Sequence, residues 1–265
     1  MKIILISHER SGSHLVAEAM HAFGLIQRVD EVCNIGAVSP LNSALSFHRF
    51  QYDWAQENRD EFLMQKFEDR RKFVDAYFNF LADKFPKADV LVDIKYGHFH
   101  NFDPFWHPVF STPMLFEVLK APGFKTIHLS RRNVVEAAVS GEVADVRGVW
   151  HSWQEGAAAK QEQTHQLDVG RVVKRAKLLK MQNRWISEEW LSGVDAKSVQ
   201  YESFVDSLNG DRKELDDLAT FLSKTADPEW LPTLKKLGKP LRETVENYDE
   251  LARACDAAGL GEFLR

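Results

Sequence analysis

The residues best suited to chemistry lie near the start of the chain, in the sequence Glu-Arg-Ser-Gly-Ser-His at positions 9–14. A short apolar stretch precedes them and an amphipathic helical pattern follows. The first N–H groups of a helix lack partners within it, and the peptide dipoles add partial positive charge, so an anion can bind there. Gly12 permits close backbone approach, Arg10 can donate charge-assisted hydrogen bonds, and Ser11 and Ser13 add hydroxyls. The segment is a candidate phosphate-binding loop, and an ordinary capped turn is the alternative.

This loop differs from the loop of nucleoside-triphosphate hydrolases. Their loop has a glycine five positions before its second glycine and a lysine directly after it. Here those two positions hold Ser7 and Ser13. The sequence therefore disfavours an ATPase or GTPase, and a kinase with a degenerate loop is kept as an alternative.

Length, charge and cysteine content limit the class of protein. We expect the 265 residues to form one domain spanning positions 1–265, because a chain of this length can bury a large core. With 34 basic and 39 acidic residues the formal charge is −5, and the chain has no long run of like charge, so no nucleic-acid partner is predicted. The first apolar run ends after Ile6, too early for a signal peptide or membrane span. Together with two cysteines that we expect to be reduced and buried, Cys33 and Cys255, this indicates a cytoplasmic protein.

The order of the expected elements predicts the fold class. β-branched and apolar residues cluster between turn signals in four segments, which we expect to be strands: 2–7, 90–95, 125–130 and 197–201. Helical patterns run from Leu15 to a stop at Gly24 and through four further segments: 61–84, 134–144, 172–191 and 212–223. Strands separated by helices predict an α/β fold, a three-layer sandwich with a central, mostly parallel sheet. Ligands of such sheets bind beyond the carboxyl ends of the strands, where the loop at Arg10 lies.

Two further segments could carry function. Residues 96–113 are rich in aromatic side chains, histidines and prolines without helical or strand periodicity, so we expect a loop over the sheet, either a packed lid or an acceptor-binding segment. After the third expected strand, Arg132 precedes a helical pattern in which Ser140 follows eight residues later, slightly over two turns. This spacing allows Arg132 and Ser140 to bind one phosphate together. Arginines in surface salt bridges are the alternative.

The two basic segments together resemble the sulfotransferase family, whose donor is 3′-phosphoadenosine 5′-phosphosulfate (PAPS). In that family a strand, loop and helix near the N-terminus bind the 5′-phosphosulfate, and the segment from Arg10 to His14 is similar to this element. A later strand followed by Arg-Asn, with a serine eight residues past the arginine, binds the 3′-phosphate. Arg132, Asn133 and Ser140 match that pattern.

Two weaker matches refine the resemblance. The segment beginning at Tyr201 resembles the family's tyrosine-glutamate sequence, in which the tyrosine approaches the adenine. Residues 246–251 are similar to bacterial members that modify carbohydrates, of the trehalose and nodulation-factor type. The resemblance implies a P-loop-like sulfotransferase fold and transfer of a sulfuryl group from PAPS to a hydroxyl of a carbohydrate, glycolipid or other small acceptor. His14 stands where the family commonly has a threonine or small residue, so it either contacts phosphate or simply begins the helix.

The implied reaction needs a cation and a base. Sulfuryl transfer is an in-line displacement that depends on positioning and charge stabilisation and requires no metal. Arg10 stays protonated and would stabilise the leaving phosphate, so a separate group must take the proton. Glu31 lies in the region of the glutamate base of the carbohydrate branch, whereas His98 lies just past the second strand, beside Lys95, which matches a family lysine. Because Gly97 stands where the family histidine is expected, we favour Glu31 over His98.

Two alternatives to a sulfotransferase keep parts of this pattern. A non-catalytic phosphonucleotide-binding protein would retain Arg10 and Arg132 but would lack a base near the donor. A kinase would instead need magnesium ligands and a bound triphosphate.

Overall fold

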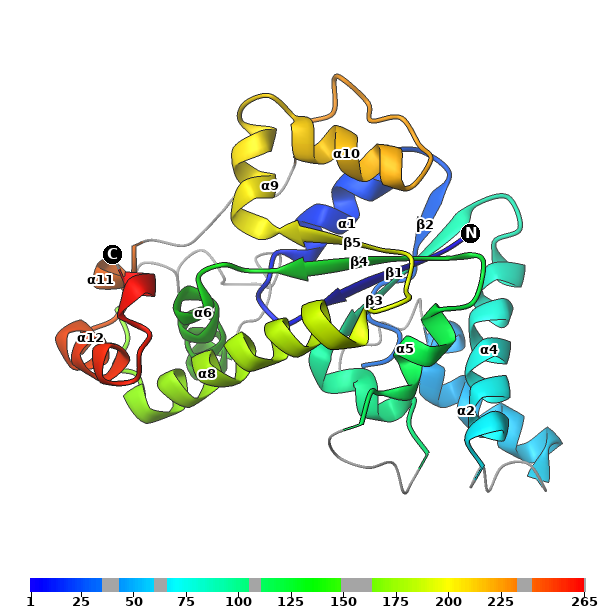
Figure 1. Ribbon diagram of the computed structural model, residues 1–265, viewed down its shortest axis with the longest axis horizontal. Helices are drawn as coiled ribbons and strands as arrows, with labels where there is room; N and C mark the ends of the chain where they lie inside the picture. Colours follow the sequence, from blue (N-terminus) through cyan, green and yellow to red (C-terminus); the bar gives the residue numbers. More distant parts are fainter. Residues whose placement is uncertain (35–42, 60–65, 105–110, 149–163, 233–239, 265) are drawn as a thin grey trace. The chain divides into compact units, whose positions relative to one another are not determined.

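The computed structural model describes residues 1–34, 43–59, 66–104, 111–148, 164–232 and 240–264 (Figure 1). The chain divides into two compact units, each assembled from several segments. The first comprises Met1–His8, Gly12–Ser130 and Trp185–Pro232, and the second comprises Glu9–Ser11, Arg131–Arg184 and Thr233–Arg265. The single domain expected from the length stays a prediction.

A five-stranded sheet in the order β2-β3-β1-β4-β5 forms the centre of the first unit, and every neighbouring pair is parallel. Its strands are β1 (Lys2–Ser7), β2 (Ile26–Arg28), β3 (Asp89–Lys95), β4 (Phe124–Ser130) and β5 (Ala196–Gln200). In the central strand, Ser7 pairs in register with Lys95 of β3 and Leu129 of β4. All carboxyl ends therefore meet at one edge of the sheet, and the predicted α/β fold with a parallel sheet is confirmed.

Helices cover both faces of this sheet (Figure 1). One face packs against α1 (Ser13–Ala22), α9 (Tyr201–Leu208) and α10 (Lys213–Phe221). The other packs against α2 (Phe47–Glu57), α4 (Phe67–Lys84) and α5 (Met114–Leu119). Successive side chains of a strand point to opposite faces, so Ile3 and Leu5 join the first core and Ile4 and Ile6 join the second.

The expected elements are present with shifted ends. The first helix ends at Ala22, and Gly24, at φ 77°, adopts the left-handed conformation that lets the chain turn. The helix expected over 61–84 begins at Phe67 in the described part of the chain, and positions 61–65 lie outside it. Tyr201, expected as the last residue of a strand, instead begins α9. The helix expected over 172–191 is α8 (Val169–Trp185) followed by a π-helical turn, η3 (Ile186–Trp190).

The aromatic segment after β3 is more ordered than the sequence predicts. A 3₁₀ helix, η2 (Tyr96–Asn101), follows the strand directly, and the side chains of Phe99 and Phe102 are buried in the core. Positions 105–110 lie outside the described residues. The expectation of an irregular loop was therefore wrong for the start of this segment, because its aromatic rings pack against the sheet.

The second unit is helical. It contains α6 (Val134–Arg147), most of α8, α11 (Leu241–Thr244), α12 (Tyr248–Ala257) and the 3₁₀ turn η4 (Gly261–Leu264). Valines and alanines of α6 and α8 pack against Leu251 and Cys255 of α12. The side chain of Asn133 accepts a hydrogen bond from the Glu136 N–H at 2.9 Å and so caps the start of α6.

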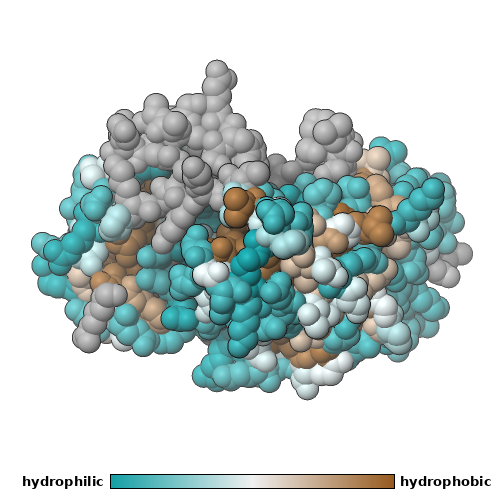
Figure 2. Space-filling view, turned by 90° about the horizontal axis from the view of Figure 1, so that it is seen from above, coloured by the Kyte–Doolittle hydropathy of each residue, from teal (hydrophilic) through white to brown (hydrophobic). Residues whose placement is uncertain are grey.

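The surface, the two cysteines and the lengths of the helices can be compared with the expectations from the sequence. Among the coloured residues of the face seen in Figure 2, hydrophilic side chains predominate, with apolar areas between them. Both cysteines are free thiols and both are buried, as expected. Among the described helices, none has the length and apolar character needed to cross a membrane.

A buried polar network lies under the carboxyl end of β4. The ring of His128 is 1 % exposed, and its Nε2 hydrogen-bonds to the Tyr96 hydroxyl at 2.6 Å while its Nδ1 is 3.3 Å from the Ser187 hydroxyl. Burial, assisted by the nearby His8, lowers the pKa of His128 from its ordinary value of 6.5 to about 4. The folded protein therefore holds His128 neutral.

This network predicts loss of stability in mild acid. Between pH 6.5 and about 4 the unfolded chain binds a proton at His128 that the folded chain does not, so the free energy of unfolding should fall by up to about 3 kcal/mol as the pH drops through this range. Urea unfolding across the range measures the slope. His128→Gln should flatten it, whereas His100→Gln, a change at an exposed residue of η2, should leave it unchanged. Equal slopes for wild type and His128→Gln would contradict the assignment.

Candidate functional site

The loop between β1 and α1 has the backbone that a phosphate loop needs. Gly12, at φ 88°, is the residue before α1, in a conformation that favours glycine. A side chain at this position would also collide with ring carbons Cδ2 and Cε2 of Tyr201, which begins α9. Gly12 gives α1 no side-chain cap, and the first turn of α1 holds no acidic residue. The partial positive charge of the helix start is thus not neutralised by its own first turn.

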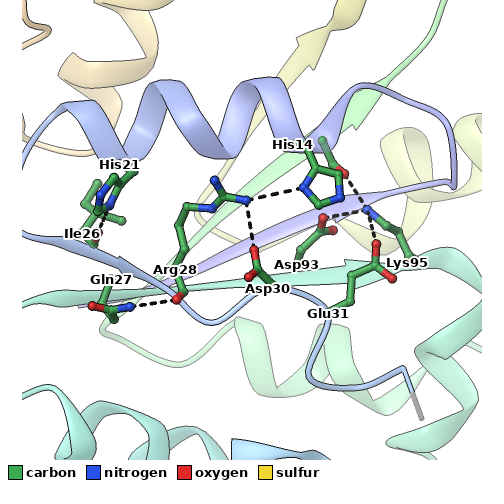
Figure 3. Close-up of polar contacts among 10 residues, drawn as sticks. His14, His21, Ile26, Gln27, Arg28, Asp30, Glu31, Asp93 and Lys95 are labelled. Carbon is green, nitrogen blue, oxygen red and sulfur yellow. Dashed lines mark hydrogen bonds and ion pairs between the residues drawn. The ribbon is translucent and has the colours of Figure 1, made fainter. Parts of the chain in front are cut away.

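Lys95 joins this helix start to the end of β3. Its Nζ lies 2.6 Å from the Ser13 hydroxyl, 3.1 Å from the Ser7 hydroxyl and 2.6 Å from Oδ2 of Asp93. Oε1 of Glu31 is a fourth oxygen neighbour at 3.4 Å, and Figure 3 shows both carboxylates beside the lysine nitrogen. Lys95 and Asp93 are 3 % and 5 % exposed. These five residues, which we call the Lys95 cluster, form a buried charged group at the carboxyl edge of the sheet.

The donor count of Lys95 leaves Glu31 as its weakest partner. An ammonium has three N–H donors, and Ser7, Ser13 and Asp93 already occupy positions at ordinary hydrogen-bond distance. The other oxygen of Glu31 accepts a hydrogen bond from Nδ2 of Asn34 at 3.0 Å, and the side chain is 16 % exposed. The hydrogen bond from Asn34 therefore orients the Glu31 carboxylate, and its contact with the Lys95 ammonium is longer than a good hydrogen bond.

His14 lies beside the Lys95 cluster, next to Arg28 (Figure 3). Nη2 of Arg28 is 3.5 Å from its Nδ1 and donates to Oδ1 of Asp30 at 3.0 Å (Figure 3). Burial lowers the pKa of His14, and this outweighs the opposing effect of Asp93. His14 therefore favours its neutral form at the start of α1.

The second unit contains its own cationic cluster. Nε of Arg10 donates to the Ser140 hydroxyl at 3.1 Å, and Nη1 of Arg131 donates to the Arg10 carbonyl at 3.3 Å. Arg131 also forms an ion pair of 2.6 Å with Glu136 in the first turn of α6. Burial lowers the pKa of Arg10, and the charges of Arg131 and Arg175 lower it further. Positive charge is thus concentrated around Ser140.

The structure brings some of the predicted residues together and separates others. Lys95, Glu31 and Ser13 meet, whereas His98 lies in η2 and forms no hydrogen bond or ion pair with Lys95 in the described part of the chain. Among the described residues, the hydroxyl of Ser140 bonds to Arg10 and not to Arg132, whose side chain is exposed.

Two more predicted residues have clear places. Ser11 is 1 % exposed, and its hydroxyl has no hydrogen-bond partner among the described residues. Such a buried hydroxyl is available to a ligand. Tyr201 lies against Gly12 at the start of α9, which is compatible with a role at the donor.

Sequence reasoning missed Asp93, Ser7 and Arg131. Asp93 precedes Lys95 by two residues on one strand, so both side chains point to the same face, and this alternation could have indicated the pair. Ser7 ends β1 in register with Lys95. Arg131 gave no such signal, because its contact with Arg10 depends on the tertiary fold.

The first unit is an α/β fold in which Lys95 and the start of α1 lie at the carboxyl edge of a parallel sheet, and the second unit holds the arginines around Ser140. The family model described as Stf0 sulphotransferase matches residues 115–248, half of the chain, and the chain belongs to this family. The resemblance to sulfotransferases is thereby confirmed, and the chain is a sulfotransferase in the general sense. A search of curated proteins finds no significant match.

Proposed function

We propose that this enzyme moves a sulfuryl group from PAPS to a hydroxyl of a carbohydrate, glycolipid or related small acceptor. The observation that carries the proposal is the Lys95 cluster, in which one ammonium contacts Ser13 at the start of α1 and the carboxylate of Glu31. A cation and a helix start favour an anionic donor, and a carboxylate beside them can accept a proton. The family supports sulfuryl transfer in general.

Two groups of residues are suited to the charged groups of the donor. The backbone N–H groups from Ser11 to His14, with Lys95, are suited to the 5′-phosphosulfate. Arg10, Arg132 and Ser140 are suited to the remaining phosphate charge because guanidinium groups bind phosphate oxygens in a bidentate manner. Tyr201 is suited to contact the adenine, as the resemblance implies.

In the proposed reaction, Glu31 takes the proton of the acceptor hydroxyl as that oxygen attacks sulfur. The bond from sulfur to the phosphate oxygen breaks in line, and 3′-phosphoadenosine 5′-phosphate (PAP) leaves. Lys95 and the start of α1 stabilise the negative charge that develops on the leaving phosphate. Arg10, which stays protonated, acts as an additional electrostatic clamp and not as an acid.

Calorimetric titration distinguishes this function from its alternatives. The protein should bind PAP more tightly than ATP with magnesium, because PAP is the product of the proposed donor and the loop lacks the lysine of triphosphate-binding loops. Tighter binding of ATP with magnesium would support a kinase and reject the proposal. A screen of hydroxylated acceptors with radiolabelled PAPS separates an enzyme from a binding protein, since only an enzyme transfers the label.

A further inference from the structure

Two guanidinium groups of the second unit lie against the middle of α6, and a third lies beside them near its start. Arg10 reaches Ser140 from the loop that precedes Gly12, and Arg131 reaches the Arg10 carbonyl from the residues before α6. The last of the three comes from α8, where the side chain of Arg175 extends to Gly141, the residue after Ser140. We call Arg10, Arg131 and Arg175 the arginine cluster.

Gly141 is what allows Arg175 to approach α6. A Cβ atom at position 141 would lie 2.6 Å from Cζ, 2.7 Å from Nη1 and 2.8 Å from Nη2 of Arg175. The guanidinium therefore occupies the space that a side chain on α6 would fill. Glycine inside a helix lowers its stability by about 0.5–1 kcal/mol relative to alanine. Gly141 therefore makes α6 less stable than alanine would, but leaves room for the Arg175 guanidinium.

Two carboxylates lie beside the arginine cluster at different distances. Glu136 is 2.6 Å from Nη2 of Arg131, whereas Oδ2 of Asp145 is 3.6 Å from Nη1 of Arg175, beyond a good hydrogen bond. Burial lowers the pKa of Arg10 most, and the charges of Arg131 and Arg175 lower it further, so each of these two cations repels Arg10. A bound anion would offset that repulsion.

We propose that Arg175 is a donor-binding residue, and that its guanidinium over Gly141, together with Arg10 and Ser140, binds the 3′-phosphate of the donor. This inference rests on the proposed function. A phosphate monoester fits the cluster because it carries close to two negative charges and offers three acceptor oxygens, enough for a guanidinium on each side. Arg175 thereby distinguishes the 3′-phosphorylated donor from nucleotides that lack this group.

The test compares PAP with adenosine 5′-monophosphate, which lacks the 3′-phosphate. Arg175→Gln and Gly141→Ala should each weaken PAP binding by about tenfold or more, the usual loss for a hydrogen bond to a charged group, and should change binding of the monophosphate by less than about twofold. Arg171→Gln is the matched control. Arg171 lies one turn earlier on α8, is 61 % exposed, and pairs with Glu142 and Asp145 at 3.4 and 3.5 Å. It should leave both affinities unchanged.

Thermal unfolding without ligand separates binding from structure. Arg175→Gln removes a like charge and Gly141→Ala inserts a better helix former, so neither should lower Tm, although both weaken PAP binding. Three results for Arg175→Gln would overturn the role of Arg175. They are an unchanged PAP affinity, equal losses of affinity for PAP and the monophosphate, or a fall in Tm large enough to explain the weaker binding. If wild type itself fails to prefer PAP over the monophosphate, the proposed function fails, and that result is distinct from a failure confined to the variants.

Discussion

Glutamine in place of Glu31 should lower kcat by about 10²- to 10⁴-fold, the usual contribution of a general base, while PAP affinity changes by less than about twofold. The amide has nearly the shape of the carboxylate and can keep a contact with Asn34, which now donates to Oε2 at 3.0 Å. It cannot accept the proton of the acceptor hydroxyl. Steady-state kinetics with radiolabelled PAPS, together with PAP calorimetry, measure both quantities.

Two variants serve as controls for this experiment. Asp30→Asn changes the adjacent carboxylate, which pairs with Arg28 and not with Lys95, and should keep most of the turnover. His98→Gln removes the competing base from η2 and should do the same. Near-normal turnover in Glu31→Gln together with an inactive His98→Gln would assign the proton to His98.

Methionine in place of Lys95 should lower the free energy of unfolding by about 3–5 kcal/mol and abolish turnover. The substitution leaves the Asp93 carboxylate, 5 % exposed, without the ammonium 2.6 Å away, and an uncompensated buried charge is strongly destabilising. It also removes the cation proposed to stabilise the leaving phosphate. Urea unfolding gives the stability, and donor titration gives the loss of binding.

A surface ion pair and a double variant separate the two effects. Lys125→Met breaks a 2.8 Å pair with Asp195, whose side chain is 56 % exposed, and should cost less than about 1 kcal/mol. The double variant Lys95→Met with Asp93→Leu removes both buried charges and should recover most of the stability without recovering turnover. Lys95→Met with wild-type stability would contradict the account of the Lys95 cluster.

Strands of the sheet could be predicted from the sequence where one uninterrupted apolar segment is long enough to indicate a strand by itself. Six or seven residues rich in isoleucine, valine and leucine identify β1 and β3 without knowledge of their neighbours. β2 has only three residues and is defined by its pairing with β3, so no pattern within it predicts a strand. α9 was not predicted, because Tyr201 was assigned to the end of a strand and the eight-residue helix that it begins was not recognised.

The site was predictable only in its contiguous part. Gly12 and Ser13 lie next to one another in the chain, and their place before a helix follows from the local pattern. Helical spacing predicts that Arg132 and Ser140 bind one phosphate, which stays a prediction. It did not indicate the hydrogen bond of the Ser140 hydroxyl with Arg10, 130 positions away. The contact of Lys95 with Ser13 spans 82 positions and depends on the parallel pairing of β1 with β3. Spacing along a chain cannot specify such contacts.

The interleaved path of the chain has a consequence for gene truncation. A fragment trimmed to the family match, 115–248, would omit β1 and β3 and would stop at the first residue of α12. β4 would then have an open edge, and Ile127 and Leu129 would lose α1, one of the helices that share their core. Unpaired apolar edges are prone to self-association, so the segment 115–248 is a poor expression target and any shortened gene should retain β1.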